Sequence, residues 1–112
     1  MKAQGKKHKG SRLERKVASL IRQKGLDKDC KRMVLSGADW AFRGDILTKL
    51  PYMIECKNNE RHNIWKEWDQ AKDQEKPMKP AVLCISGNYR PILAVMEIDT
   101  FLNLVKEVEE KK

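Results

Sequence analysis

The stretch "GDILTKLPYMIECK" (residues 44–57) contains two short β-prone runs with a turn between them. Successive side chains of a strand point to opposite faces, so Glu55 and Lys57 share one face. If the two runs form a hairpin, Asp45 stands opposite Glu55, with Cβ atoms about 4.5–5.5 Å apart. Two carboxylates at that distance repel each other unless a positive charge lies between them.

A divalent cation would compensate this repulsion. Mg²⁺ typically takes one or two carboxylates together with phosphate and water. Lys57 adds an ammonium group that can orient an attacking water and neutralise charge that develops on a phosphorus. The alternative is an edge strand whose polar face is solvated, since Glu-x-Lys is common on such strands. The set formed by Asp45, Glu55 and Lys57 predicts a site that hydrolyses phosphodiesters.

Length and composition indicate a single domain. The chain has 112 residues and a net charge of +8. Its longest apolar runs, residues 81–85 and 92–96, are too short to span a membrane, and no apolar segment of a secretory signal follows the basic start. Three cysteines without a Cys-x-x-Cys pair are typical of reduced thiols. We therefore expect a cytoplasmic protein.

The positive charge is concentrated in the first third of the chain. Residues 1–32 hold 12 Lys and Arg against three Asp and Glu, whereas residues 33–112 hold 12 against 13. Such polarity favours a surface or arm that binds a polyanion, and nucleic acid is the interpretation we adopt over a merely solvated charge run.

The order of predicted elements is α-β-β-β-α-β-β-α, an α/β fold with a central mixed β-sheet flanked by helices. Three helices are predicted. The first begins at a Ser11 cap and ends at Gly25, the second covers residues 64–75, and the third follows an Asp99 cap. The strands are predicted at 30–37, 44–50, 51–57, 81–86 and 91–98. Residues 1–10 are predicted to form a disordered basic arm, and residues 11–112 a single domain. The apolar stripes of the first and last helices are Leu13, Val17, Leu20 and Ile21, and Phe101, Leu104, Val105 and Val108.

Gly44-Asp45 followed by Glu55-Cys56-Lys57 resembles the motif of the PD-(D/E)xK nucleases, which have the restriction-endonuclease-like fold. Gly44 stands where the family motif has proline. Residues 9–25 are similar to the first helix of the archaeal Holliday-junction resolvases and their small phage relatives. Residues 32–37 resemble their Arg-to-Ser-Gly segment, and residues 65–86 resemble their glutamine-bearing helix and following strand.

The resemblance implies a metal-dependent nuclease domain at residues 11–112. Asp45, Glu55 and the main-chain carbonyl of Cys56 would hold Mg²⁺, with Mn²⁺ as a possible substitute, and Lys57 would position the attacking water. Glu14 would approach from the first helix, and Gln70 would lie beside the lysine. Residues expected to contact DNA are Lys6, Lys7, Lys9, Arg12, Arg15, Arg32 and Ser36.

Several assignments have alternatives. Asp39 is a second candidate for the metal-binding aspartate, although strand position favours Asp45. Glu14 also completes a capping box with the preceding Ser11. Gln74 could serve instead of Gln70. Two tryptophans, Trp65 and Trp68, are interpreted as core or dimer-interface residues rather than base-stacking platforms.

The resemblance implies a metal-dependent DNA endonuclease that acts on branched DNA in a prokaryotic or phage-infected cell. The predicted function is a Holliday-junction resolvase, which cuts four-way junctions. A symmetric junction needs two nicks, so a two-fold homodimer is the natural assembly. A second reading keeps the active site and changes the substrate to nicked, flapped or linear duplex DNA. A third reading is a DNA-binding module without catalysis.

Overall fold

The structure, a computed structural model, describes residues 2–33 and 45–112, with side chains from Ser11 onward. The described part contains three helices, which are α1 (Lys2–Gln23), α2 (Ile64–Asp73) and α3 (Ile98–Glu110). It also contains five strands, which are β1 (Lys31–Arg32), β2 (Ile46–Leu47), β3 (Met53–Asn58), β4 (Ala81–Ser86) and β5 (Leu93–Val95). The element order and the α/β class are those predicted from the sequence.

The main sheet is mixed, as predicted, with strand order β3-β4-β5. Strands β3 and β4 are parallel, in register from Met53↔Ala81 to Asn58↔Ser86. Strands β4 and β5 are antiparallel. Helix α2 connects the two parallel strands, which need a crossover because a tight turn cannot join them.

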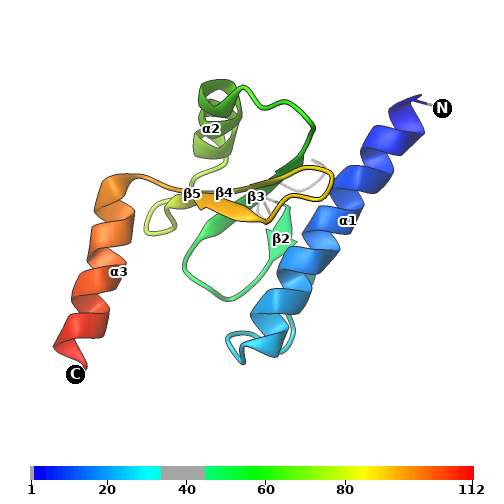
Figure 1. The fold of residues 1–112 in the computed structure, drawn as a ribbon. Helices are drawn as coiled ribbons and strands as arrows, with labels where there is room; N and C mark the ends of the chain where they lie inside the picture. Colours follow the sequence, from blue (N-terminus) through cyan, green and yellow to red (C-terminus); the bar gives the residue numbers. More distant parts are fainter. Residues whose placement is uncertain (1, 34–44) are drawn as a thin grey trace.

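The sheet lies between α1 and α2, so each face has its own core (Figure 1). On one face, apolar residues of α1 pack against alternate residues of β3 and β4; these are Leu13, Val17, Ala18 and Ile21 against Ile54, Cys56 and Cys84. On the other face, Ala71 of α2 packs with Ala81, Leu83 and Ile85, beside the partly buried Trp68. The predicted stripe of α1 is correct except at Leu20, which is 41% exposed.

Strand β2 does not form the predicted ladder with β3. It pairs antiparallel with β1, with Arg32 opposite Ile46. A backbone hydrogen bond from Asp45 to Ile54, 2.9 Å long, connects the start of β2 to β3. The main-chain partner of Asp45 is thus Ile54, one position from the predicted partner Glu55, a slip for which the Pro51 turn leaves room.

A buried carboxylate holds β2 in place. Asp27, in the loop after α1, accepts hydrogen bonds from the Thr48 hydroxyl and the Lys49 N–H, both 2.8 Å long. The bond from Lys49 is the main reason why the pKa of Asp27 lies below its ordinary value. This contact ties the end of β2 to the end of α1, and so it helps to position Asp45.

Helix α1 begins earlier than the sequence predicts. The chain is already helical at Lys2, so residues 2–10 extend α1 instead of forming an irregular arm. Ser11 therefore lies inside the helix and does not cap it. The C-terminal end is as predicted, since Gly25 has a φ of 73° just after the last turn.

Helix α3 also begins before its predicted cap. Glu97 is the cap residue and Ile98 is helical, so β5 is shorter than the predicted strand at 91–98. No residue of α3 is buried. The helix projects from the end of the sheet that lies away from α1 (Figure 1). No helix in the described part of the chain is long and apolar enough to cross a membrane.

Candidate active site

Asp45 and Glu55 lie together at the edge of β3. Besides the main-chain bond to Ile54, the Asp45 carboxylate accepts a hydrogen bond of 2.7 Å from the N–H of Cys56. The negative charge of Asp45 acts on the pKa of Glu55, so the two carboxyl groups lie close together. The structure therefore brings together the two carboxyls that the sequence places on neighbouring strands.

Both carboxyls have raised pKa values. Burial, followed by the negative charge of Asp45, raises the pKa of Glu55 to about 8. Burial also raises the pKa of Asp45, although the bond from Cys56 and the charge of Lys57 oppose this effect. At neutral pH Glu55 is thus mostly protonated. Two partly buried acids whose negative charges oppose each other form a site that a cation would stabilise.

Alternation along β3 determines which groups face this site. Ile54 and Cys56 point toward α1, so Glu55 and Lys57 point to the opposite face. Lys57 lies close enough that its charge lowers the pKa of both acids. Glu55 and Lys57 therefore interact electrostatically on the same face of β3.

The main chain of Cys56 also faces Asp45. Two N–H groups of this segment point toward β4: Met53 donates to the Pro80 carbonyl, and Asn59 donates to the Ser86 carbonyl. The N–H of Cys56 points the other way and donates to Asp45. In a strand the N–H and C=O of one residue point to the same side, so the Cys56 carbonyl is directed away from β4. Its thiol is buried in the α1-side core.

These groups fit a divalent cation by their chemistry. Hard cations take oxygen ligands, and two acidic side chains and one carbonyl oxygen are directed to the same edge. Within residues 11–33 and 45–112, no group of three His, Cys, Asp or Glu side chains forms a ready-made metal cluster. A cation at this edge would therefore depend on main-chain oxygen and water as well as on Asp45 and Glu55.

Glu14 approaches the same edge from α1. Its carboxylate accepts a hydrogen bond of 3.0 Å from Arg32, whose guanidinium also donates to the Ser11 hydroxyl at 3.1 Å. Burial raises the pKa of Glu14 despite this bond, and the charge of Asp45 adds to the effect. The capping-box alternative for Glu14 is wrong, because Ser11 is not a cap and bonds to Arg32 instead.

Other predicted site residues are not brought to this edge by any described contact. Gln70 is exposed on α2, and Gln74 is the C-cap of that helix. Arg12 and Arg15 are exposed on α1. Ser36 and Asp39 lie outside the described residues, as do the side chains of Lys6, Lys7 and Lys9. Their roles stay predictions.

Sequence reasoning missed a second charged pair. His62 donates or accepts through Nδ1 at 2.7 Å from the buried Glu67, and its Nε2 lies 2.8 Å from the Ser86 carbonyl. Burial lowers the pKa of His62, but these hydrogen bonds more than offset it, so the pKa is raised. The spacing of His62 and Glu67 was a local signal, whereas the contact with Ser86 joins positions far apart in the chain.

Comparison with known proteins gives one match. Residues 5–112 match the model of a family described as "Phage putative PDDEXK endonuclease". No curated protein and no solved structure matches the chain. The match covers all three helices except the first residues of α1, and it includes both carboxyls and the lysine of the site.

Proposed function

Since this chain belongs to the phage PD-(D/E)xK endonuclease family, we propose that it is a metal-dependent DNA endonuclease that cuts branched DNA. Nucleases of this kind generally use divalent metal ions. We propose Mg²⁺ as the ion, with Mn²⁺ able to replace it, and the four-way junction as the main substrate. Such a substrate would place the activity in the cytoplasm of the infected cell.

The observation that carries this proposal is the close pair of Asp45 and Glu55 beside Lys57. Burial raises the pKa of both acids, and the charge of Asp45 adds to the effect at Glu55, so ionising both acids costs free energy. Perturbed acids of this kind are typical of functional sites. Arg32 and Glu14 support the same edge from the opposite side of β3.

In the proposed mechanism Asp45, Glu55 and the Cys56 carbonyl hold the cation. The bound ion would supply positive charge to the phosphate under attack. Lys57 orients the attacking water and offsets the negative charge that develops on the phosphorus. The new P–O bond forms to water while the bond to the 3′ oxygen breaks, which leaves a 5′-phosphate and a 3′-hydroxyl. Glu14 and Gln70 are proposed to assist from α1 and α2.

A homodimer is the assembly that we propose. The exposed face of α3 supports it, since it presents large apolar side chains; these are Ile98, Phe101, Leu102, Val105 and Val108. A cavity of about 490 Å³ continues this surface to Ile64 and Trp65 of α2. A second copy of the chain would cover these residues and place two active sites on one junction.

Equilibrium sedimentation would test the dimer. Phe101→Asp should shift the protein to monomers, because it places a charge in the apolar face of α3. Asn103→Asp adds the same charge to an exposed polar position of the same helix and should keep the dimer. A wild-type protein that is monomeric at all concentrations would refute this assembly.

The nuclease is tested by incubating the protein and Mg²⁺ with a labelled four-way junction, beside matched nicked, flap, linear and single-stranded DNAs. Paired symmetric nicks in the junction are expected. Preferential cutting of nicked, flap or linear DNA would change the substrate and retain the active site. Tight binding without cutting in either Mg²⁺ or Mn²⁺ would refute the enzyme and favour a DNA-binding module.

A further inference from the structure

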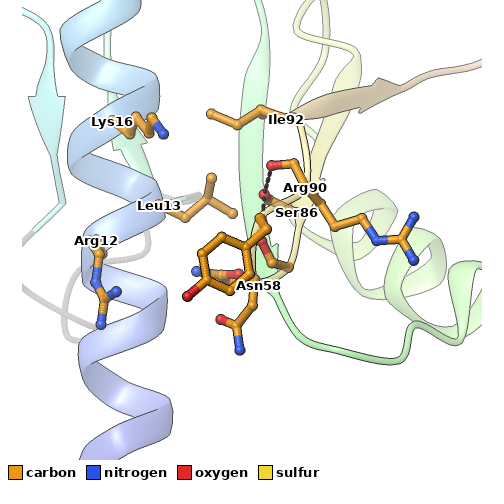
Figure 2. Close-up of a pocket in the computed structure, with 10 residues that line it drawn as sticks. Arg12, Leu13, Lys16, Asn58, Ser86, Arg90 and Ile92 are labelled. Atoms are coloured by element: carbon orange, nitrogen blue, oxygen red, sulfur yellow. Dashed lines mark hydrogen bonds between the residues drawn. The ribbon is translucent and has the colours of Figure 1, made fainter.

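A groove of about 480 Å³ lies between α1 and the turn that joins β4 to β5. Arg12, Leu13 and Lys16 form its α1 wall, and Asn58, Ser86 and Ile92 face them from the sheet (Figure 2). The volume falls within the range of pockets that bind small organic groups, about 300–1,000 Å³. The groove is thus large enough to hold part of a polymer such as DNA.

The charge of the groove is positive. Arg12 and Lys16 are exposed cations on its α1 wall, and none of the ten lining residues is acidic. Arg90 also lines the groove, but Figure 2 shows its guanidinium directed away from α1. A groove with cations along one wall and neutral amides and hydroxyls along the other suits a phosphodiester backbone.

The opposite wall is a turn held in one conformation. The N–H of Arg90 donates to the Gly87 carbonyl at 3.2 Å, and the Ser86 hydroxyl donates to the Arg90 carbonyl at 3.1 Å. The N–H of Asn88 donates to Glu60 at 2.9 Å. A Cβ atom at Gly87 would lie 2.9 Å from the Asn59 carbonyl oxygen, so glycine alone lets this turn pack on the end of β3.

Tyr89 stands at the tip of this turn in an unfavourable conformation. Its φ is 60°, at the turn position that requires positive φ and that glycine or asparagine normally fills. Its side chain is fully exposed, so the ring gains no burial that would offset the strain. A hydrogen-bonded turn that presents an exposed aromatic ring beside a basic wall suits the stacking of an unpaired base.

The groove and the active site are built from neighbouring residues. Leu13 precedes Glu14 on α1, and Asn58 follows Lys57 on β3. Alternation along β3 directs Asn58 toward α1 and Lys57 to the other face. A strand that leaves the catalytic edge can therefore enter the groove after a short path around β3.

We propose that this groove binds an unpaired nucleotide of the DNA substrate, with its phosphate on Arg12 and Lys16 and its base stacked on Tyr89. The proposal rests on the proposed action on DNA, and it makes that function more specific. In a four-way junction the unpaired nucleotide would come from an opened branch point beside the cleaved duplex.

The test is DNA binding without metal, so that it does not depend on catalysis. Fluorescence anisotropy with a labelled single-stranded oligonucleotide and a blunt duplex in EDTA compares wild type with Tyr89→Ala. The variant should bind the single strand about fivefold to a hundredfold more weakly, the effect of losing one stacked base, with duplex binding unchanged. Tyr89→Phe keeps the ring and should bind like wild type.

The charge on the α1 wall is tested by salt dependence. Removing Arg12 or Lys16 should reduce the slope of log affinity against log salt by about 0.7 for the single strand. Lys28→Ala, which removes an exposed cation from the loop after α1, is the matched control and should keep the slope. Equal slopes for Lys16→Ala and wild type would overturn the assignment of phosphate to this wall.

Thermal unfolding separates binding from folding. Tyr89→Gly should unfold at no lower temperature than wild type, because glycine adopts this φ without steric strain, and should still lose single-strand binding. A lower unfolding temperature would show that the ring supports the fold and would overturn the proposal, as would Tyr89→Ala binding the single strand like wild type. Lost cleavage with retained Tyr89-dependent binding would refute only the nuclease.

Discussion

The two faces of strand β3 differ in whether the surroundings of their side chains favour burial. On the α1 face, Ile54 and Cys56 are buried among apolar residues. On the other face, burial and the charge of Asp45 raise the pKa of Glu55 to about 8. One face thus stabilises the fold, whereas the other retains an electrostatic penalty. We interpret that penalty as the part of the strand devoted to function.

The largest effect is expected from Glu55→Gln. Glutamine keeps the shape of the mostly protonated acid and likewise carries no charge, so the free energy of unfolding should change by less than about 1 kcal/mol. Nicking should fall by about a thousandfold or more, because the proposed cation ligand is lost. Asp45→Asn and Lys57→Ala should also abolish nicking and retain junction binding.

Rates of nicking and thermal unfolding curves measure both quantities on the same preparations. Glu107→Gln, which removes an exposed carboxylate of α3, is the control and should alter neither. Normal turnover by Glu55→Gln would refute the active site described here.

The opposite face is tested by Ile54→Ala. Ile54 is only 7% exposed, so its truncation should lower the free energy of unfolding by about 2–5 kcal/mol, measured by urea denaturation. Leu93→Ala, on β5 of the same sheet and 53% exposed, should cost less than about 1 kcal/mol. Similar losses in the two variants would mean that the α1-side core contributes less than its burial indicates.

The link between the two faces is tested by Arg32→Ala. Arg32 holds Glu14 at 3.0 Å and Ser11 at 3.1 Å, and without it the half-buried carboxylate lacks this cation. The free energy of unfolding should fall by about 1–3 kcal/mol. Arg15→Ala removes an exposed arginine of α1, the helix that carries Glu14, and serves for comparison in the same denaturation experiment. If both variants lose equally little, the Arg32–Glu14 contact is not structural.

The smallest effect concerns His62 and Glu67, which are hydrogen-bonded to each other. The raised pKa of His62 means that its contribution to stability is complete below the unfolded value of 6.5 and is lost as the pH rises through the folded value. The loss should be less than about 1 kcal/mol. Unfolding temperatures measured across this range should decline less in His62→Asn than in wild type; parallel declines would contradict the role of His62.

Patterns within one element were predictable from the sequence. Alternation along residues 53–58 places Glu55 with Lys57 and Cys56 with Ile54, and the structure agrees. The stripe of α1 was predictable apart from Leu20. The equally periodic stripe of α3 is exposed in the single chain, since periodicity defines an apolar face but not the surface that covers it.

Contacts between elements were harder to predict. Asp45 and Glu55 meet as expected, yet β2 pairs with β1 and reaches β3 mainly through Asp45. The helical state of residues 2–10 was missed because their composition lacks an apolar period. Gln70 stays a prediction, because helical spacing alone does not determine how an exposed side chain relates to a site on another element.

The sequence by itself determined the class of fold, the face that Glu55 and Lys57 share, and the positive charge of the first helix. These properties depend on neighbours along the chain, where backbone geometry sets which side chains lie together. Only the tertiary structure decided that burial raises the pKa of Asp45 and Glu55, that Arg32 holds Glu14, and that Tyr89 lines one groove with the basic residues of α1. Each of these contacts joins distant positions, so it depends on how the elements pack rather than on any local pattern.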